Sequence, residues 1–192
     1  ALDDEQVVED VAINETNFPD ENFRNWILER YGSDGVLTDD EIASADKISF
    51  PDIRVQSLKG IEYFTALGTL YFCDSPITTL DVSKNTELTY LGCPNCQLTS
   101  LDVSKNTKLT SLYCNGNNLT SLDVSQNTAL KNLAIYSNQI KGAEMDTLVE
   151  SLPTVSSGTL YAIYNTDEQN EMTTTQVAAA LAKGWTPKYM VN

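Results

Sequence analysis

Three consecutive stretches decide the fold: ITTLDVSKNTELTYLGCPNCQ at residues 77–97, LTSLDVSKNTKLTSLYCNGNN at 98–118 and LTSLDVSQNTALKNLAIYSNQ at 119–139. They follow one another without a gap, and each is 21 residues long. A looser copy of 22 residues, VQSLKGIEYFTALGTLYFCDSP, precedes them at 55–76. Self-similarity at such a fixed, short period indicates a stack of small units that bury their apolar faces against one another.

Each copy fits the pattern L-x-x-L-x-L-x-x-N/C-x-L, which is the leucine-rich-repeat signature in spacing and length. The alternation of Leu112 with Cys114, and of Leu133 with Ile135, predicts a strand with one face inward. Stacked strands of this kind predict an α/β solenoid with a parallel sheet on its concave side. The polar half of each copy, LDVSxNT, predicts tight turns or a short 3₁₀ segment, because its short polar side chains bond to nearby backbone.

Two polar columns recur in these turns and allow two interpretations. Carboxylates in register could attract a metal ion, or the side chains could satisfy the N–H groups of a tightly turning backbone. We favour the second interpretation. The columns are Asp81, Asp102 and Asp123, and Asn85, Asn106 and Asn127.

The four cysteines take repeat positions. Cys93 and Cys114 occupy an inward strand position and are expected to act as small core residues. Cys96 stands where the other repeats have Ser75, Asn117 and Asn138, and Cys73 lies on the opposite strand face as a partly exposed thiol. The Cys93-x-x-Cys96 spacing is typical of zinc sites, but a zinc site needs four ligands and the chain has no histidine. We therefore predict no zinc.

Both ends carry segments that suit solenoid caps, which need a polar outer face. Residues 1–54 predict a helical N-terminal cap, with one helix in Pro19–Arg30 and a capping box at Thr38 that opens a second. Residues 55–140 hold the four repeats. Residues 141–192 predict a βαβ-like C-terminal cap, in which a helix in 144–152 precedes a strand in 159–164, a helix in 174–183 and a strand in 185–191. All three parts are expected to form one structural unit.

One loop in the N-terminal cap resembles an EF-hand or dockerin-type calcium loop. Asp34 and Glu41 stand at ligand positions, with Gly35 at the sharp turn. Arg30 and Gly32 occupy the first and third positions, where carboxylates are needed. We therefore predict a degenerate loop that keeps the helix-loop-helix shape and no cofactor, with Asp34 and Glu41 as a weak calcium candidate.

The amino-acid composition limits the classes of partner and activity that are expected of this chain. Twelve Lys and Arg against 27 Asp and Glu give a net charge of -15, which repels phosphate backbones and anionic lipid headgroups. The longest small-apolar run, 177–182, is far shorter than the roughly 20 residues of a spanning helix. Without a histidine base or a glycine-rich phosphate loop, the chain is not expected to be an enzyme. We predict no nucleic acid partner and no membrane insertion of this segment.

The repeat Leu-x-x-Leu-Asp-Val-Ser-x-Asn-Thr-x-Leu resembles that of the exported, internalin-like leucine-rich-repeat proteins of gut bacteria. The flanks NFPDENFRNWILERYG at 17–32 and 158–189, from GTLYAIYN to GWTPKY, are also similar to that group, so the likeness covers nearly the whole chain. The resemblance implies an extracellular or cell-surface location on a bacterium and a protein or glycan partner. The chain opens at Ala1 without an apolar signal core, so an export signal has been removed or was never present.

Strand residues that face away from the core line the concave sheet, and they are where we expect a ligand. They combine tyrosine with uncharged polar residues, a mixture that makes adaptable contact surfaces. The alternative is that tyrosine only suits strands and packs across them. We predict a non-enzymatic binding or adhesion module for a protein, peptide or glycan, or alternatively a structural spacer in a surface assembly. The predicted ligand-binding residues are Tyr71, Tyr90, Tyr113, Asn115, Asn132 and Tyr136, with Tyr161 extending the patch.

Overall fold

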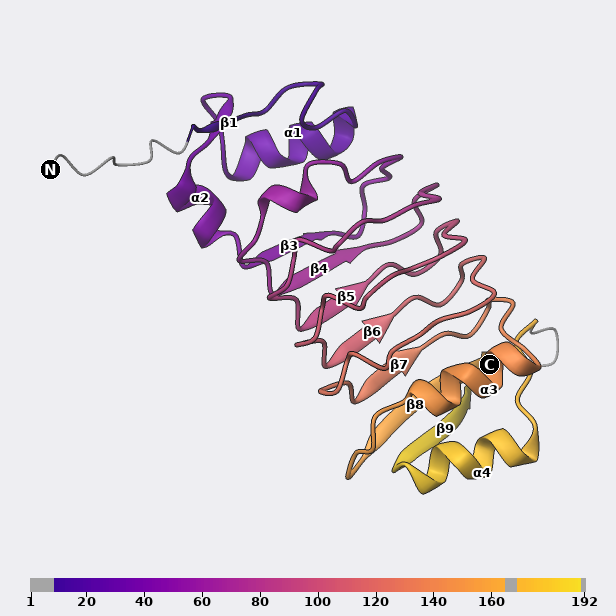
Figure 1. Ribbon diagram of the computed structural model, residues 1–192. Coiled ribbons are helices and arrows are strands. Elements are labelled where there is room, and N and C mark those ends of the chain that lie inside the picture. The colour runs from indigo at the N-terminus through magenta and orange to yellow at the C-terminus, as the bar shows by residue number, and fades with distance from the viewer. Residues whose placement is uncertain (1–8, 165–168, 191–192) are drawn as a thin grey trace, which may run out of the picture.

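A parallel sheet of seven strands runs along one side of the molecule in the order β3-β4-β5-β6-β7-β8-β9 (Figure 1). The computed structural model describes residues 9–164 and 169–190. Its repeat strands are β4 (Thr69–Phe72), β5 (Tyr90–Gly92), β6 (Ser111–Tyr113) and β7 (Asn132–Ala134). The central leucine of each pairs with that of the next strand, as Leu91 does with Leu112. The predicted solenoid with its parallel sheet is confirmed.

The interior of the stack consists of aliphatic columns that repeat once per turn. Members of the leucine and valine columns, among them Leu109, Leu112, Val82 and Val103, are fully buried. Burying one such side chain contributes about 1.5–3 kcal/mol. Because each repeat covers only its neighbours, the two end repeats need caps.

Two columns of polar side chains hold successive turns together. In the strand-end column, Asn117 accepts a hydrogen bond from the Leu98 N–H through Oδ1 (3.0 Å) and donates through Nδ2 to the Cys93 and Cys114 carbonyls (3.0 Å each). In the turn column, Asn106 donates through Nδ2 to the Val82 and Asn85 carbonyls, at 2.9 Å each.

The expectation that the turn asparagines satisfy backbone N–H groups was therefore wrong. Asn85, Asn106 and Asn127 all donate to carbonyl oxygens of the preceding turn. The reason is that each turn directs two carbonyls toward its successor, and a buried carbonyl needs a donor. The expectation holds for the aspartates: Asp81, Asp102 and Asp123 accept from the N–H two residues on.

The N-terminal cap closes one end of the stack with aromatic side chains. It contains β1 (Val11–Ala12), which pairs antiparallel with β2 (Val36–Leu37), and the helices α1 (Glu21–Arg30) and α2 (Asp39–Ser44). Phe23 packs on Phe50, and Phe50 stacks on Phe72 in the first repeat, with ring centroids 5.8 and 6.0 Å apart.

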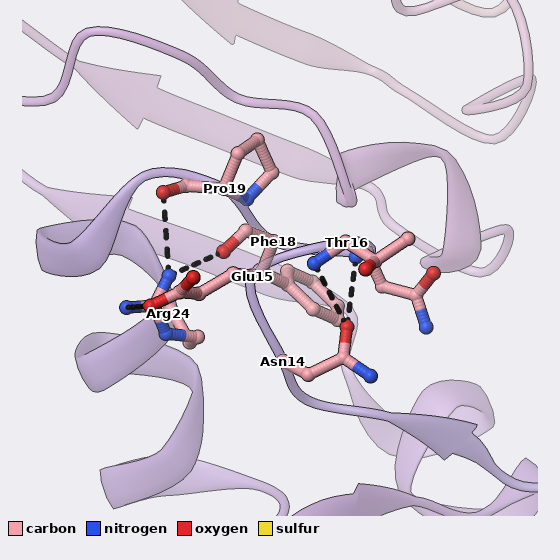
Figure 2. A network of polar contacts seen from close by, with 7 residues as sticks. Asn14, Glu15, Thr16, Phe18, Pro19 and Arg24 are labelled. Carbon is pink, nitrogen blue, oxygen red and sulfur yellow. Dashed lines mark hydrogen bonds and ion pairs between the residues drawn. The ribbon is translucent and has the colours of Figure 1, made fainter.

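Arg24 ties the entry loop of this cap to α1 (Figure 2). Its Nη1 donates to the Phe18 carbonyl at 2.7 Å and to the Pro19 carbonyl at 3.3 Å. Asn14 Oδ1 accepts from the Thr16 N–H at 3.0 Å in the same loop. The predicted capping box is confirmed, since the Glu41 N–H donates to Thr38 Oγ1 while the Glu41 carboxylate accepts from the Thr38 N–H.

The C-terminal cap lies at the opposite end of the stack (Figure 1). It consists of α3 (Ala143–Ser151), β8 (Gly158–Tyr164), α4 (Thr174–Ala182) and β9 (Trp185–Met190), and β8 and β9 are parallel. This is the predicted βαβ-like arrangement. Trp185 is fully buried, and its indole Nε1 donates to the Pro153 carbonyl at 2.7 Å.

Three strands were not predicted. β1, β2 and β3 (Lys47–Phe50) all lie within the segment 1–54 that was expected to be helical, and β3 forms the first strand of the main sheet. A short 3₁₀ helix, η1 (Ile61–Tyr63), follows in the first repeat. The segment boundaries at 54 and 140 otherwise stay predictions. No helix among the described residues is long and apolar enough to span a membrane.

Candidate functional site

The candidate site is the outward face of the seven-stranded sheet, here called the concave face. Its side chains form two columns that run across the strands in pairwise register. The first column is Lys47, Thr69, Tyr90, Ser111, Asn132, Thr159 and Thr186. The second column is Ser49, Tyr71, Gly92, Tyr113, Ala134, Tyr161 and Lys188.

The ring of Tyr71 lies across the neighbouring strand, over Gly92. A Cβ atom at position 92 would approach Tyr71 Cδ2 to 2.5 Å and Tyr90 Cε1 to 3.2 Å. Only glycine therefore lets both rings lie at their observed positions. Burial raises the pKa of Tyr71 to about 12, and Cys73 adds to the shift.

Tyr90 and Tyr113 continue this aromatic surface on the next two strands. Their ring centroids are 5.4 Å apart and their planes are tilted by 33°, an arrangement that adds about 0.5–1.5 kcal/mol beyond area burial. Burial raises the pKa of Tyr90, with a further contribution from Tyr113. The three tyrosines, Tyr71, Tyr90 and Tyr113, therefore form one contiguous and half-buried cluster.

The other predicted site residues differ in how far they are exposed on the concave face. Asn132 is partly exposed in the first column, and its Nδ2 donates to Ser111 Oγ at 3.2 Å. Tyr136 is partly exposed just beyond β7. Asn115 lies just beyond β6 and is only 7% exposed, so it offers a ligand little surface. Its strand-end position, next to the inward Asn117, explains this burial.

The face extends further than the sequence indicated, because both caps contribute a strand. β3 adds Lys47 and Ser49, and β9 adds Thr186 and Lys188. The Nζ of Lys188 lies 5.8 Å from the centroid of the Tyr161 ring, within the range of a cation–π interaction. The alternation of Ile48 and Phe50 with Lys47 and Ser49 is the one signal for β3 in the sequence, and it is too short to separate a strand from a loop.

Charge is distributed very unevenly between this face and the whole chain. The chain has 27 acidic residues, yet the seven strands of the sheet contain no Asp or Glu and two lysines, Lys47 and Lys188, on the outermost strands. The aspartates Asp52 and Asp74 follow β3 and β4 at the strand-end border and raise the pKa of Cys73, although burial is the larger cause. The centre of the face is therefore uncharged.

The weak calcium candidate has its carboxylates engaged within the protein. Glu41 Oε2 accepts hydrogen bonds from the Thr38 N–H and hydroxyl, both at 2.9 Å, and Asp34 accepts from the Val36 N–H at 3.3 Å. No group of three or more His, Cys, Asp or Glu side chains that could hold a metal ion occurs in residues 9–164 and 169–190. The prediction of a degenerate loop without a metal ion, with Asp34 and Glu41 as a weak calcium candidate, stays untested.

The turn side of the solenoid has shallow inter-repeat hollows, and its carboxylates serve the turns. One hollow lies between the third and fourth repeats and is lined by Ser100, Asp102, Ser121 and Asp123. Hydrogen bonds from Ser104 hold the pKa of Asp102 below its usual value, and Ser83 does the same for Asp81. These aspartates cap turns and do not converge on a ligand.

No protein-family model and no curated protein sequence matches the chain. Several solved structures do match the chain. The functional domain of InlJ from Listeria monocytogenes, described as including a cysteine ladder, is 28% identical over 89% of this chain, with a TM-score of 0.69. Internalin InlF of the same species is 20% identical over 96% (TM-score 0.65), and internalin C2 is 18% identical over 97% (TM-score 0.58).

The chain spans only part of the first two of these proteins, 41% of the InlJ domain and 58% of InlF, but 91% of internalin C2. The two structures with lower identity bear on the fold alone. All three have the repeat architecture that the periodicity predicts, and all come from a bacterium. The chain therefore has a leucine-rich-repeat fold that is similar to the fold of these internalins.

Proposed function

We propose that this protein is a non-enzymatic binding module, extracellular or on the surface of a bacterium, that recognises a protein, peptide or glycan through its concave face. The observation that carries the proposal is the cluster of Tyr71, Tyr90 and Tyr113 on an uncharged face. Tyrosines of this kind are enriched at the energetic centres of interfaces, because they bring large area at low entropic cost.

The rigid position of the tyrosine cluster on the sheet also supports the proposal. The cluster stands on β4, β5 and β6, strands whose inward residues are fully buried, and the missing side chain of Gly92 leaves room for two of its rings. Such a surface is already organised before a partner arrives, so little ordering free energy is lost on binding. The likeness to internalins supports a protein-interaction role for the fold.

A screen on peptide, protein and glycan arrays tests the proposal. The wild-type protein is compared with a triple variant, Tyr71→Ser, Tyr90→Ser and Tyr113→Ser. A matched control, Thr86→Ala, Thr107→Ala and Thr128→Ala, changes one exposed residue per repeat on the turn side. Circular dichroism first checks that both variants fold.

We expect at least one ligand class whose binding weakens more than tenfold in the tyrosine variant and stays unchanged in the control, because truncating a central aromatic contact commonly costs more than 1 kcal/mol. Equal binding by all three proteins would refute the concave site.

A second candidate function is a structural spacer in a surface assembly. The outer face of α4 favours it: Ala178, Ala179, Leu181 and Ala182 are exposed, and Leu181 is 54% accessible, although it is a large apolar side chain at the end of the stack. A spacer would self-associate through this end. Analytical ultracentrifugation of wild-type protein and Leu181→Lys distinguishes the two functions, since only a spacer would lose a dimer or larger oligomer.

A further inference from the structure

The second column of the concave face alternates small and large side chains. From β3 to β8 it reads Ser49, Tyr71, Gly92, Tyr113, Ala134 and Tyr161, each in register with the next. Two of the three small residues are covered: Gly92 lies beneath the rings of Tyr71 and Tyr90, and Ala134 is only 2% exposed, whereas Ser49 is partly exposed. The tyrosines of this column therefore stand on every second strand, and Tyr90 of the first column lies on β5 between Tyr71 and Tyr113.

This recurrence sets a distance that a partner must match. Neighbouring strands are about 4.8 Å apart, so the backbone positions of the tyrosines in the second column recur at about 9.6 Å. An extended peptide repeats its side-chain direction every two residues, or about 6.8 Å, which is far too short. Two turns of an α-helix advance about 10.8 Å and lose register by more than about 1 Å per step. A polyproline II helix advances about 9.3 Å in its three-residue turn and matches.

The hydrogen-bonding groups of the face also suit a polyproline II segment. Such a helix makes no internal hydrogen bonds, and its backbone carbonyls are acceptors without partners. The first column, beside the tyrosines, supplies donors in Thr69, Ser111, Asn132 and Thr159, all partly exposed. Aromatic surfaces lined with such donors are how proline-rich segments are commonly recognised.

The charges on the concave face indicate which residues of the partner should flank its prolines. The centre of the face has no charge, whereas Lys47 on β3 and Lys188 on β9 are exposed at its two ends. Lys188 lies beside Tyr161, the last tyrosine of the column. A carboxylate next to the final proline turn would meet this ammonium group.

We propose that the partner contributes a proline-rich segment in the polyproline II conformation, with proline at every third residue and carboxylates at its ends, that lies across the strands from Tyr71 to Tyr161. This inference rests on the proposed function, since it takes the concave face as the binding surface. It adds the conformation, period and charge of the bound segment.

Three synthetic peptides test the proposal by isothermal titration calorimetry with the whole chain. EPASPASPE has proline at every third residue, EPAPSPASE has the same composition with proline at every second residue, and KPASPASPK reverses the end charges. The variants are Tyr113→Ala in the middle of the column, Lys188→Gln at its end, and Thr107→Ala on the turn side as a control.

We expect EPASPASPE to bind at least tenfold more tightly than either other peptide. Its affinity should fall at least tenfold in Tyr113→Ala and about threefold in Lys188→Gln, and stay unchanged in Thr107→Ala. Equal affinity for the two proline spacings, or binding that Tyr113→Ala leaves intact, would overturn the proposal, as would failure of all three peptides to bind.

Failure of this inference is distinguishable from failure of the proposed function. If the peptides do not bind but the triple tyrosine variant loses an array ligand, the concave site stands and the polyproline II partner is wrong. A neutral oligosaccharide that binds the tyrosine cluster while EPASPASPE does not would likewise rule out the polyproline II partner and leave the site in place. If the triple variant keeps every array ligand, the site itself is wrong.

Discussion

The interior of the repeats and their concave face differ in how constant the residue type is from one repeat to the next. Inside, each column holds nearly one residue type from turn to turn, as with Val82, Val103 and Val124 or Asn85, Asn106 and Asn127. On the concave face the residue changes at every strand, and the second column alternates in size. Stacking identical turns requires self-complementary side chains inside but places no such demand outside. The variable face is therefore where we expect a partner to be recognised.

The largest expected loss of stability comes from a substitution in the turn column. Asn106→Asp replaces a donor to two buried carbonyls with a carboxylate against the same oxygens, and a buried, uncompensated charge costs at least about 3 kcal/mol. The free energy of unfolding from urea titration should fall by at least this amount. Asn118→Asp, at an exposed position, is the control and should change it by less than about 0.5 kcal/mol. Similar losses in both variants would contradict the structural role of the turn column.

Substitutions at two adjacent residues of β6 allow the stability contributions of the interior and of the concave face to be compared directly. Leu112 is fully buried, whereas Tyr113 is partly exposed on the concave face. We expect Leu112→Ala to lower the free energy of unfolding by about 3 kcal/mol through loss of burial and creation of a cavity. Tyr113→Ala should cost about 1 kcal/mol, the contribution of its contact with Tyr90. If both losses were equal, the tyrosine would be a structural residue.

Cys96 is an exception within the strand-end column and offers a stabilising change. Its Sγ donates to the Pro94 carbonyl at 3.5 Å and shares a hydrogen bond with the Ser75 backbone, whereas the equivalent Asn117 accepts from one N–H and donates to two carbonyls. The Ile77 N–H, which lacks an acceptor from this column, bonds to the Ser75 carbonyl. We expect Cys96→Asn to raise the free energy of unfolding by about 1 kcal/mol. A loss of stability would show that the thiol's packing matters more than the missing hydrogen bonds.

The last expected effect is a pH dependence of stability that arises on the concave face, where solvent screening weakens the contribution of a partly exposed hydroxyl. The pKa of Tyr71 is about 12 in the folded protein, against about 10 in the unfolded chain. A raised pKa contributes stability that is fully present below about pH 10 and is lost as the pH rises toward about 12. The unfolding free energy of the wild type should therefore fall more steeply between about pH 9 and 11.5 than that of Tyr71→Phe. Parallel curves would contradict the burial of this hydroxyl.

The sequence was sufficient to predict the repeats, their register and most elements of the caps. Periodicity determines these features, because a 21-residue pattern such as Leu91, Leu112 and Leu133 admits one stacking register. The first strand of the main sheet, β3, was missed because Ile48 and Phe50 are only two alternating residues and no full repeat surrounds them, and β1 and β2 were missed because each has only two residues. A short pattern of this kind does not separate a strand from a loop.

The candidate site was predicted in its columns but not in its extent or contacts. Strand alternation placed Tyr71, Tyr90 and Tyr113 on one face, yet the contact between Tyr71 and Gly92 depends on ring orientations that no sequence pattern specifies. The burial of Asn115 likewise depends on how the chain turns after β6. Lys47 and Lys188 join the face through strands of the two caps, where the repeat pattern has ended.

Tyrosine footprinting tests the binding role of the concave face most directly. Wild-type protein is oxidised by hydroxyl radicals, with and without the tightest ligand from the arrays, and modification is quantified for each tyrosine by mass spectrometry. We predict that the ligand protects Tyr71, Tyr90 and Tyr113 at least threefold and leaves Tyr31 in the N-terminal cap unchanged. Unaltered oxidation of the three concave tyrosines at saturating ligand would contradict the concave binding site.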